Sequence, residues 1–192
     1  SLCLIPKLGL AYFPRTDPGQ FVINVKAPTG THLDGTDKFV AQVEDTSRKE
    51  VPPDETHPTL PNIGLTPALS AMTTSNSGQH TAFIQANLKE GHRVSSFDYM
   101  ERVRRRVHDE LPIVDAYFQS GGLVDAVLNL GLPAPIDIQI SGKNLNEMHD
   151  IAVEIARKVR ATKGVGDVLI PQDIDAPSIR MEIDRVQAAK LG

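Results

Sequence analysis

The sequence predicts an α+β fold built from repeated strand–helix units, and two observations support this. The same order of a short strand, a capping residue and an amphipathic helix occurs three times, with strands beginning near residues 21, 81 and 136. Each helical segment carries its apolar residues on one stripe, as a helix covering one face of a sheet does. Two such units in series form a split β-α-β sandwich, with both helices on one face of an antiparallel or mixed sheet.

Three units correspond to one complete and one partial ferredoxin-like sandwich. We expect residues 20–120 to form the complete one, 121–134 to link the two, and 135–192 to form the first half of the second. The chain therefore reads as part of a longer protein that supplies the missing unit.

The first unit begins with a strand over residues 21–26. Its helix is expected to start at Thr31, with Asp34 three residues later as in a capping box. The connection over residues 52–79 is rich in Pro, Thr, Ser and Gly, and only residues 62–65 in it resemble a strand.

The second unit has a strand over residues 80–88 and a helix capped by Ser95 with Asp98. Its helix exposes a mixed run of Arg and acidic residues from Glu101 to Asp109, which we interpret as a solvated face; a phosphate or partner patch is the alternative. A further strand over residues 113–119 completes the sandwich.

The third unit alternates apolar and polar residues over 136–140, which predicts a half-buried strand. Asn144 and Glu147 cap the following helix, and Gly164 follows its end. A second strand is expected over 164–170.

The amino-terminal segment, Leu2 to Phe13, is mostly apolar but shorter than the roughly 20 residues that span a bilayer. It is either a terminal strand or core peptide, or residues 1–19 are the outer end of a membrane helix and its exit turn. No signal-peptide pattern is present.

Composition argues against a nucleic-acid partner, because the net charge is -4 and aromatic residues make up only 5% of the chain. The single cysteine, Cys3, excludes an internal disulfide. The six His residues lack the close pairing of a zinc site. Asp173 and Asp175 lie in an expected surface loop. Two carboxylates act as an acid–base pair only in different environments, which a surface loop does not provide. We therefore predict a protein that is not an enzyme and has no cofactor and no metal site.

The order and spacing of several short motifs resemble the second large periplasmic loop of resistance-nodulation-division (RND) multidrug efflux transporters of the acriflavine-resistance type. The motifs cover nearly the whole chain; they are Phe13–Gln20, Ala27–Thr31, Asn76–Gly78, Ala134–Gln139, Gly164–Val168 and Ile183–Gly192. The resemblance implies two porter subdomains, the first (PC1) complete and the second (PC2) only begun.

It also implies a segment, lying in the periplasm, of a proton-driven, homotrimeric antiporter of the inner membrane. Such a pump works with a periplasmic adaptor protein and an outer-membrane channel, and it exports drugs or other hydrophobic and amphiphilic small molecules through a cleft between the subdomains. The residues that match cleft positions form the expected substrate path: Val22, Asn24, Lys26, Ser75, Asn76, Ser77, Gly78, Gln85, Phe118 and Asp137.

Two alternatives stay open. A metal-exporting pump would need several Met sulfurs that converge on a soft ion, and the four Met residues are scattered: Met72, Met100, Met148 and Met181. A stand-alone ligand-sensing module could share the sandwich fold. An RNA-binding sandwich would need a basic, aromatic central strand pair, which this sequence does not have.

Overall fold

The computed structural model describes residues 16–64, 78–122 and 134–175, together with residues 125, 127, 129 and 132. The first unit contains β1 (Gln20–Lys26), α1 (Leu33–Glu50) and β2 (Leu60–Ile63), and the second contains β3 (Thr81–Asn87), α2 (Ser96–Glu110) and β4 (Asp115–Ser120). Helix α4 (Leu145–Arg160) follows in the third unit.

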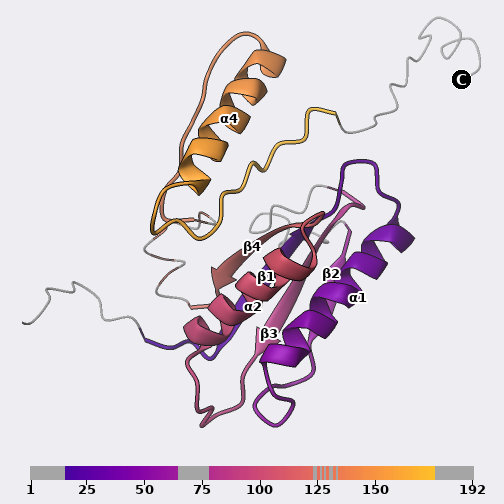
Figure 1. Cartoon of the computed structure of the whole chain (residues 1–192), viewed down its shortest axis with the longest axis vertical. Helices are drawn as coiled ribbons and strands as arrows, with labels where there is room; N and C mark the ends of the chain where they lie inside the picture. Colours follow the sequence, from indigo (N-terminus) through magenta and orange to yellow (C-terminus); the bar gives the residue numbers. More distant parts are fainter. Residues whose placement is uncertain are drawn as a thin grey trace, which may run out of the picture.

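The four strands form one antiparallel sheet in the order β2-β3-β1-β4, with α1 and α2 together on one face (Figure 1). This order, with two β-α-β crossovers in series, is that of a ferredoxin-like sandwich. The predicted α+β fold class is confirmed. The division of the whole chain into domains stays a prediction.

The core lies between the sheet and its two helices. On β1 the residues Phe21, Ile23 and Val25 are 0–1% exposed, and they pack with the corresponding inward residues of β3 and β4. Val40 and Val43 of α1, with Val103, Val107 and Tyr99 of α2, complete the core from the helix side. The expected inward stripes of α1 and α2 are present, but Tyr99 was not predicted as a core residue. Leu33, which the sequence pattern places on the inward stripe of α1, is 42% exposed.

Helix caps explain where the helices begin. Ser95 and Asn144 cap α2 and α4 as predicted, because the Ser95 hydroxyl accepts from the Phe97 amide and the Asn144 side chain accepts from the amides of residues 146 and 147. The predicted cap of α1 at Thr31 is wrong by one residue. The cap is His32, whose Nδ1 accepts from the Asp34 amide, while the Thr31 hydroxyl donates to the carbonyl of Pro28.

The third unit forms its helix but not the predicted strands over residues 136–140 and 164–170. Ile136 and Ile138 are 76% and 53% exposed. A strand exists only when its backbone groups are hydrogen-bonded to a neighbour, and no strand of the described residues lies beside either segment. The alternating pattern is therefore present without the partner that would complete it.

Helix α4 lies apart from the sandwich in Figure 1, and among its residues only Ala156 is buried. Its predicted stripe is half-exposed or exposed, with Leu145 at 61%. Within the described parts of the chain, no helix is both long enough and apolar enough to cross a bilayer.

Candidate functional site

The sheet face opposite α1 and α2, here called the outer face, carries most of the residues expected to line a substrate path. Strand side chains alternate between faces, so Val22, Asn24 and Lys26 point away from the core residues of β1. The strand register places Gln85 of β3 and Gln119 of β4 beside Val22, and Tyr117 beside Asn24. The outer face is therefore mixed in character, with amide, cationic and aromatic groups.

Residues 167–173, here called the strap, lie across this outer face. Leu169 and Pro171 of the strap and Asn24, Lys26, Thr81 and Tyr117 of the sheet enclose a cavity of only about 10 Å³. That space holds one water molecule at most. Asn24 is 5% exposed, and its Nδ2 donates to Gln119 Oε1 at 3.1 Å. The centre of the expected path is thus covered in this structure.

Asp167 attaches one end of the strap to β4 and α2. Its carboxylate accepts from the Phe118 amide at 2.9 Å and from Arg104 Nε at 3.0 and 3.1 Å, and its side chain is 10% exposed. β4 is an edge strand, so the Phe118 amide would otherwise face outward without a strand partner. The Arg104 guanidinium also lies 5.2 Å from the centre of the Phe118 ring, within cation–π range.

Asp173 attaches the other end of the strap to β1 and to the residue before β3. One carboxylate oxygen lies 2.5 Å from Lys26 Nζ and the other 2.8 Å from His80 Nε2, with the Asp173 and His80 side chains each 9% exposed. Lys26 Nζ also donates to the carbonyl of Ile170 at 3.2 Å. Burial alone would raise the pKa of Asp173, but the hydrogen bonds from Lys26 and His80 outweigh it and lower the pKa.

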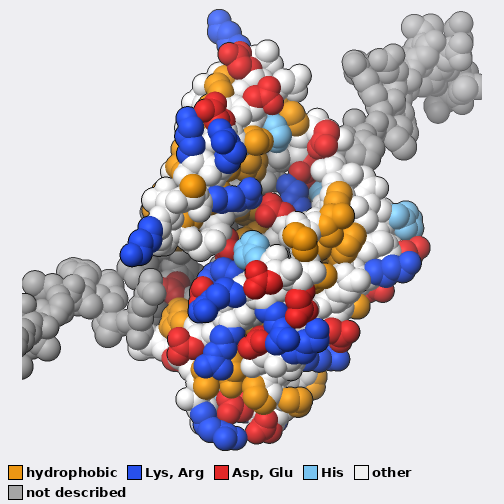
Figure 2. Space-filling view, in the orientation of Figure 1, with side chains coloured by type: hydrophobic (Ala, Val, Ile, Leu, Met, Phe, Trp, Pro, Cys, Tyr) orange, Lys and Arg blue, Asp and Glu red, His pale blue; other side chains and the backbone are white. Residues whose placement is uncertain are grey.

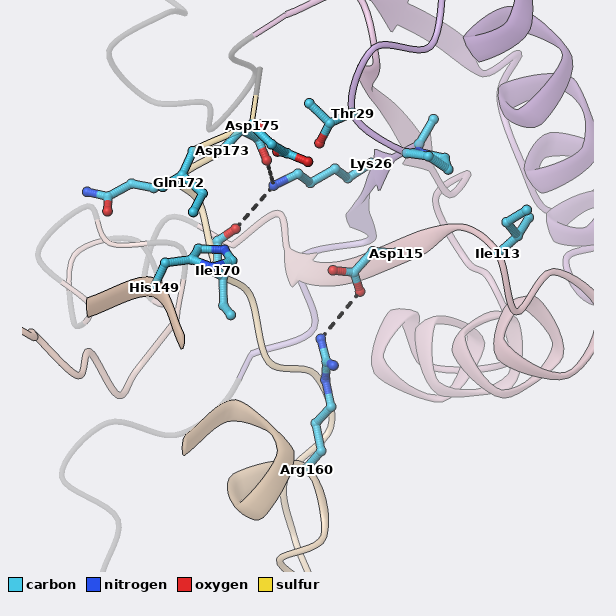
Figure 3. A pocket seen from close by; sticks show the side chains of 13 residues that line it. Lys26, Thr29, Ile113, Asp115, His149, Arg160, Ile170, Gln172, Asp173 and Asp175 are labelled. Atoms are coloured by element: carbon cyan, nitrogen blue, oxygen red, sulfur yellow. Dashed lines mark hydrogen bonds and ion pairs between the residues drawn. The ribbon is translucent and has the colours of Figure 1, made fainter. Parts of the chain in front are cut away.

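A pocket of about 390 Å³, lined by both charged and apolar side chains, adjoins this ion-paired end of the strap (Figure 3). Its walls come from the end of β1, the start of β4, helix α4 and the residues after the strap; the charged side chains among them are Lys26, Asp115, Arg160, Asp173 and Asp175. Figure 3 shows Arg160 reaching from α4 toward Asp115, 3.6 Å away. In Figure 2, acidic, basic and His side chains gather where the α4 region meets the sandwich.

The remaining predicted path residues are in different places. Phe118 belongs to the core cluster and is 8% exposed, so its ring lies on the helix side of the sheet and not on the outer face. Asp137 is exposed and accepts a hydrogen bond from Gln139 at 2.8 Å. Gly78 is half-buried next to His80. Ser75, Asn76 and Ser77 lie outside the described residues.

Three residues of this site were missed by sequence reasoning. Asp173 was assigned to a surface loop, Asp167 was noted only within a motif, and Arg104 was grouped with a solvated face. Nothing in the local pattern distinguishes them, because their partners across the site are 49 to 147 residues away. The only signal available was that acidic residues flank an apolar stretch, Val168 to Pro171, that is too short to be a helix.

The charged side chains described at this site attach the strap to the sandwich. In the described ranges, no three His, Cys, Asp or Glu side chains converge as a metal-binding group would require. The carboxylate of Asp173 binds Lys26 and His80, and that of Asp167 binds Arg104 and the Phe118 amide. Both therefore act as fixed charges that hold the strap.

A family model described as the AcrB/AcrD/AcrF family matches residues 1–192. Two crystal forms of a heavy-metal efflux pump have similar structures, with TM-scores of 0.71 and 0.69 at 21% and 23% sequence identity. They cover 100% and 92% of this chain, and the chain spans only 20% and 18% of the length of those pump chains. No curated protein matches the sequence. Because the family model covers the entire chain, this protein belongs to the AcrB/AcrD/AcrF family of RND efflux transporters.

Proposed function

We propose that this chain is a porter segment of a proton-driven RND efflux pump and that its outer sheet face forms part of the path for organic amphiphilic compounds. The observation that carries the proposal is the match of the family model to all 192 residues. The mixed character of the outer face is in keeping with it, because Val22 and Tyr117 offer apolar surface beside the polar groups of Asn24, Lys26 and Gln85.

The contacts between the strap and the sandwich support a role in movement. Ion pairs and side-chain hydrogen bonds, made by Asp167 and Asp173, hold the strap to the sandwich. Polar contacts of this kind can separate and re-form at a smaller cost than a shared apolar core, as in interfaces between mobile domains. A porter must open and close around its cargo, and this junction suits that task.

The rest of the pump is proposed on the same basis. The chain spans about a fifth of the length of the pumps it resembles in structure. We place it in the periplasm as part of an inner-membrane homotrimer that works with an adaptor protein and an outer-membrane channel. It would be a first porter subdomain (PC1) followed by the start of a second (PC2). The energy would come from proton-binding groups elsewhere in the pump, so the segment itself is moved and catalyses no reaction.

Export of a heavy metal is a second candidate, favoured by the two structural neighbours, which are described as heavy-metal efflux pumps. A soft monovalent ion would be bound by thioether sulfurs. Of the two methionines in the described ranges, Met100 packs against the sandwich core, and Met148 lies against Gly142 at the start of α4. They serve separate packing roles, so organic cargo is our first proposal.

A susceptibility experiment with the full-length gene separates these candidates. A host strain without its major efflux pumps would express the gene together with its adaptor, and growth would be measured against dyes, detergents and antibiotics and against copper, silver and zinc salts. We expect protection against organic amphiphiles. Protection limited to metal salts would replace the first candidate by the second, and no protection against either would contradict both.

The path itself is tested by thiol labelling in the intact pump. Gln85 is half-buried on the outer face, so Gln85→Cys should react with a maleimide, and an exported compound present in excess should slow the reaction. Lys38→Cys on the exposed side of α1 is the matched control. Equal protection at both positions, or none at Gln85→Cys, would contradict the assignment of the outer face.

A further inference from the structure

We propose that the strap is a releasable cover of the outer face and that Asp173 is the positioning residue that holds it closed. The cover itself is visible in the structure, because Leu169 and Pro171 lie against Asn24 and Tyr117 with space for a single water between them. The consequence for export rests on the function proposed above, but the release of the strap does not depend on it.

The strap is held to the sandwich by side chains and is not a fifth strand. The described sheet has four strands, and none of its hydrogen-bonded ladders includes residues 167–173. A segment paired to β4 through a full ladder would need to break several backbone hydrogen bonds to leave. The strap is instead attached to the sandwich by the carboxylates of Asp167 and Asp173, six residues apart at its two ends, and by the carbonyl of Ile170, which accepts from Lys26.

The two ends differ in what they contact. Asp167 binds a backbone amide of the edge strand together with Arg104, and it follows directly after the turn that ends α4, where the Val165 amide donates to Thr162. The Asp167 end is therefore fixed to two elements at once. Asp173 contacts the flexible side chain of Lys26 and the ring of His80. The strap can thus swing away at the Asp173 end while the Asp167 end stays in place.

The contact with Lys26 makes Asp173 the main attachment of its end of the strap. The same ammonium group binds the Asp173 carboxylate and the carbonyl of Ile170, so it grips the strap at two points three residues apart. Lys26 is also a residue of the outer face, and it lines the pocket of about 390 Å³. Loss of the Asp173 charge would leave the half-buried Lys26 ammonium without its anion. The strap would then lose most of its preference for the closed position.

His80 places this contact beside the connection that precedes β3. The His80 ring contacts Asp173 on one side. On another it lies so close to Gly78 that a Cβ atom at that position would be 3.1 Å from the ring. Its backbone carbonyl accepts from the Ala27 amide at the end of β1. Closure of the strap therefore also fixes the His80 ring. A compound that displaces the strap would free Lys26 at the end of β1 and His80 just before β3.

Thiol accessibility in the full-length pump tests the proposal. Asn24→Cys, in a background without native cysteines such as Cys3, would be reacted with a small maleimide in membranes. The rate would be compared between the parent, Asp173→Asn and Asp175→Asn. Asp175 is exposed and lines the same pocket, so Asp175→Asn makes the same charge change without touching the strap contacts. Lys38→Cys normalises for reagent delivery, and Ile23→Cys, in the core, reports unfolding.

We expect Asp173→Asn to raise the labelling rate of Asn24→Cys by about tenfold, which corresponds to a shift of about 1.4 kcal/mol toward the open position. Asp175→Asn should leave the rate within about twofold of the parent. Labelling of Ile23→Cys should stay slow in all variants. A rate in Asp173→Asn that matches Asp175→Asn would overturn the proposal.

A second variant decides the matter if Asp173→Asn unfolds the sandwich and exposes Ile23→Cys. His80→Gln removes one of the two groups that hold Asp173 and keeps a neutral polar side chain, and it should raise Asn24→Cys labelling in the same direction. No rise with His80→Gln would count against the releasable strap. Labelling requires no transport, so a released strap in a pump that exports nothing would contradict the proposed function alone.

Discussion

The first sandwich and residues 134–175 use the same sequence pattern, yet among the described residues only the first forms a sheet. In β1 the alternating residues Phe21, Ile23 and Val25 are almost fully buried, whereas Ile136 and Ile138 in the equivalent strand position of the third unit are mostly exposed. Both regions form a capped helix after the strand segment. The comparison shows that capping and amphipathicity fix a helix locally, but a strand needs a partner from elsewhere.

The largest expected effect tests this contrast directly. Ile23→Ala should lower the free energy of unfolding of the sandwich by about 2–5 kcal/mol, because it leaves a cavity in a core without solvent access. Ile138→Ala should change it by less than about 0.5 kcal/mol, because that side chain is already exposed. Urea denaturation of the 192-residue chain, followed by circular dichroism, measures both. Similar losses for the two variants would mean that residues 136–140 are packed in solution.

The next effect concerns a buried polar contact inside the first sandwich, whereas residues 136–139 of the third unit are exposed. The Tyr99 hydroxyl donates to Glu55 Oε2 at 2.6 Å, and Arg93 binds the other oxygen of the same carboxylate. Tyr99→Phe removes one donor from a buried acid, so we expect a loss of about 1–2 kcal/mol at neutral pH by the same measurement. Arg102→Ala, at an exposed neighbouring position that contacts the Tyr99 ring, is the control and should have a smaller effect.

Tyr99 also gives the sandwich a dependence on alkaline pH. Burial, followed by the hydrogen bond to Glu55, raises the pKa of Tyr99 to about 12 from its usual value near 10. A raised pKa means that the folded state binds the proton more tightly than the unfolded state does. This contribution to stability is therefore complete below pH 10 and is lost between pH 10 and 12. The parent and Tyr99→Phe should converge in stability over that window, and a constant difference between them would contradict this account.

A smaller effect is expected where the chain enters the sandwich. Asp17 accepts hydrogen bonds from the Ser96 amide and hydroxyl, from the Gly19 amide and from His92. Burial opposes the charged form, but these hydrogen bonds outweigh it and lower the pKa of Asp17 well below its usual range. The stabilisation is present above about pH 4 and is lost as the pH falls. Asp17→Asn should cost roughly 1 kcal/mol at pH 7, since the group is partly exposed.

Acid titration of stability checks the Asp17 prediction. The difference between the parent and Asp17→Asn should shrink as the pH falls below 4, because the carboxylate then binds a proton in the unfolded state but stays ionised in the folded state, where its pKa is lowered. Asp37→Asn, at an exposed position on α1, supplies the control for a general charge change. A difference at pH 2 that is as large as at pH 7 would show that the side-chain shape, and not its charge, carries the effect.

The sequence was sufficient for the features that depend on neighbours along the chain. The order of strands and helices in the first sandwich and the caps Ser95 and Asn144 follow from local patterns, and the structure confirms them. The cap of α1 was misplaced because Thr31 and His32 both can accept from the first turn, and the Thr31 hydroxyl is taken by Pro28. N-cap preference favours Thr over His, so the observed cap at His32 runs against propensity.

Features that depend on distant residues were only partly accessible. The resemblance grouped Val22, Asn24 and Lys26, and the alternation of β1 puts all three on the outer face. It matched Phe118 to a position across the cleft, and the register of Phe118 opposite Ile23 puts its ring in the core cluster. The strap contacts of Asp167 and Asp173 could not be foreseen, because an acidic residue in a loop has the same local appearance whether water or a buried lysine surrounds it.

The smallest expected effect on the sandwich sharpens the comparison further. Ser95 and Asn144 make the same kind of cap, but α2 packs into the core and α4 does not. Ser95→Ala should lower the free energy of unfolding of the sandwich by about 1 kcal/mol. Asn144→Ala should leave it unchanged and increase hydrogen exchange only in the first turn of α4, residues 145–148, since the first amides of that helix lose their acceptor. Denaturation and peptide-level exchange on the same samples measure the two effects. If Asn144→Ala destabilised the sandwich as much as Ser95→Ala, α4 and the sandwich would have to unfold as one cooperative unit, and the strap could then not open independently of the core.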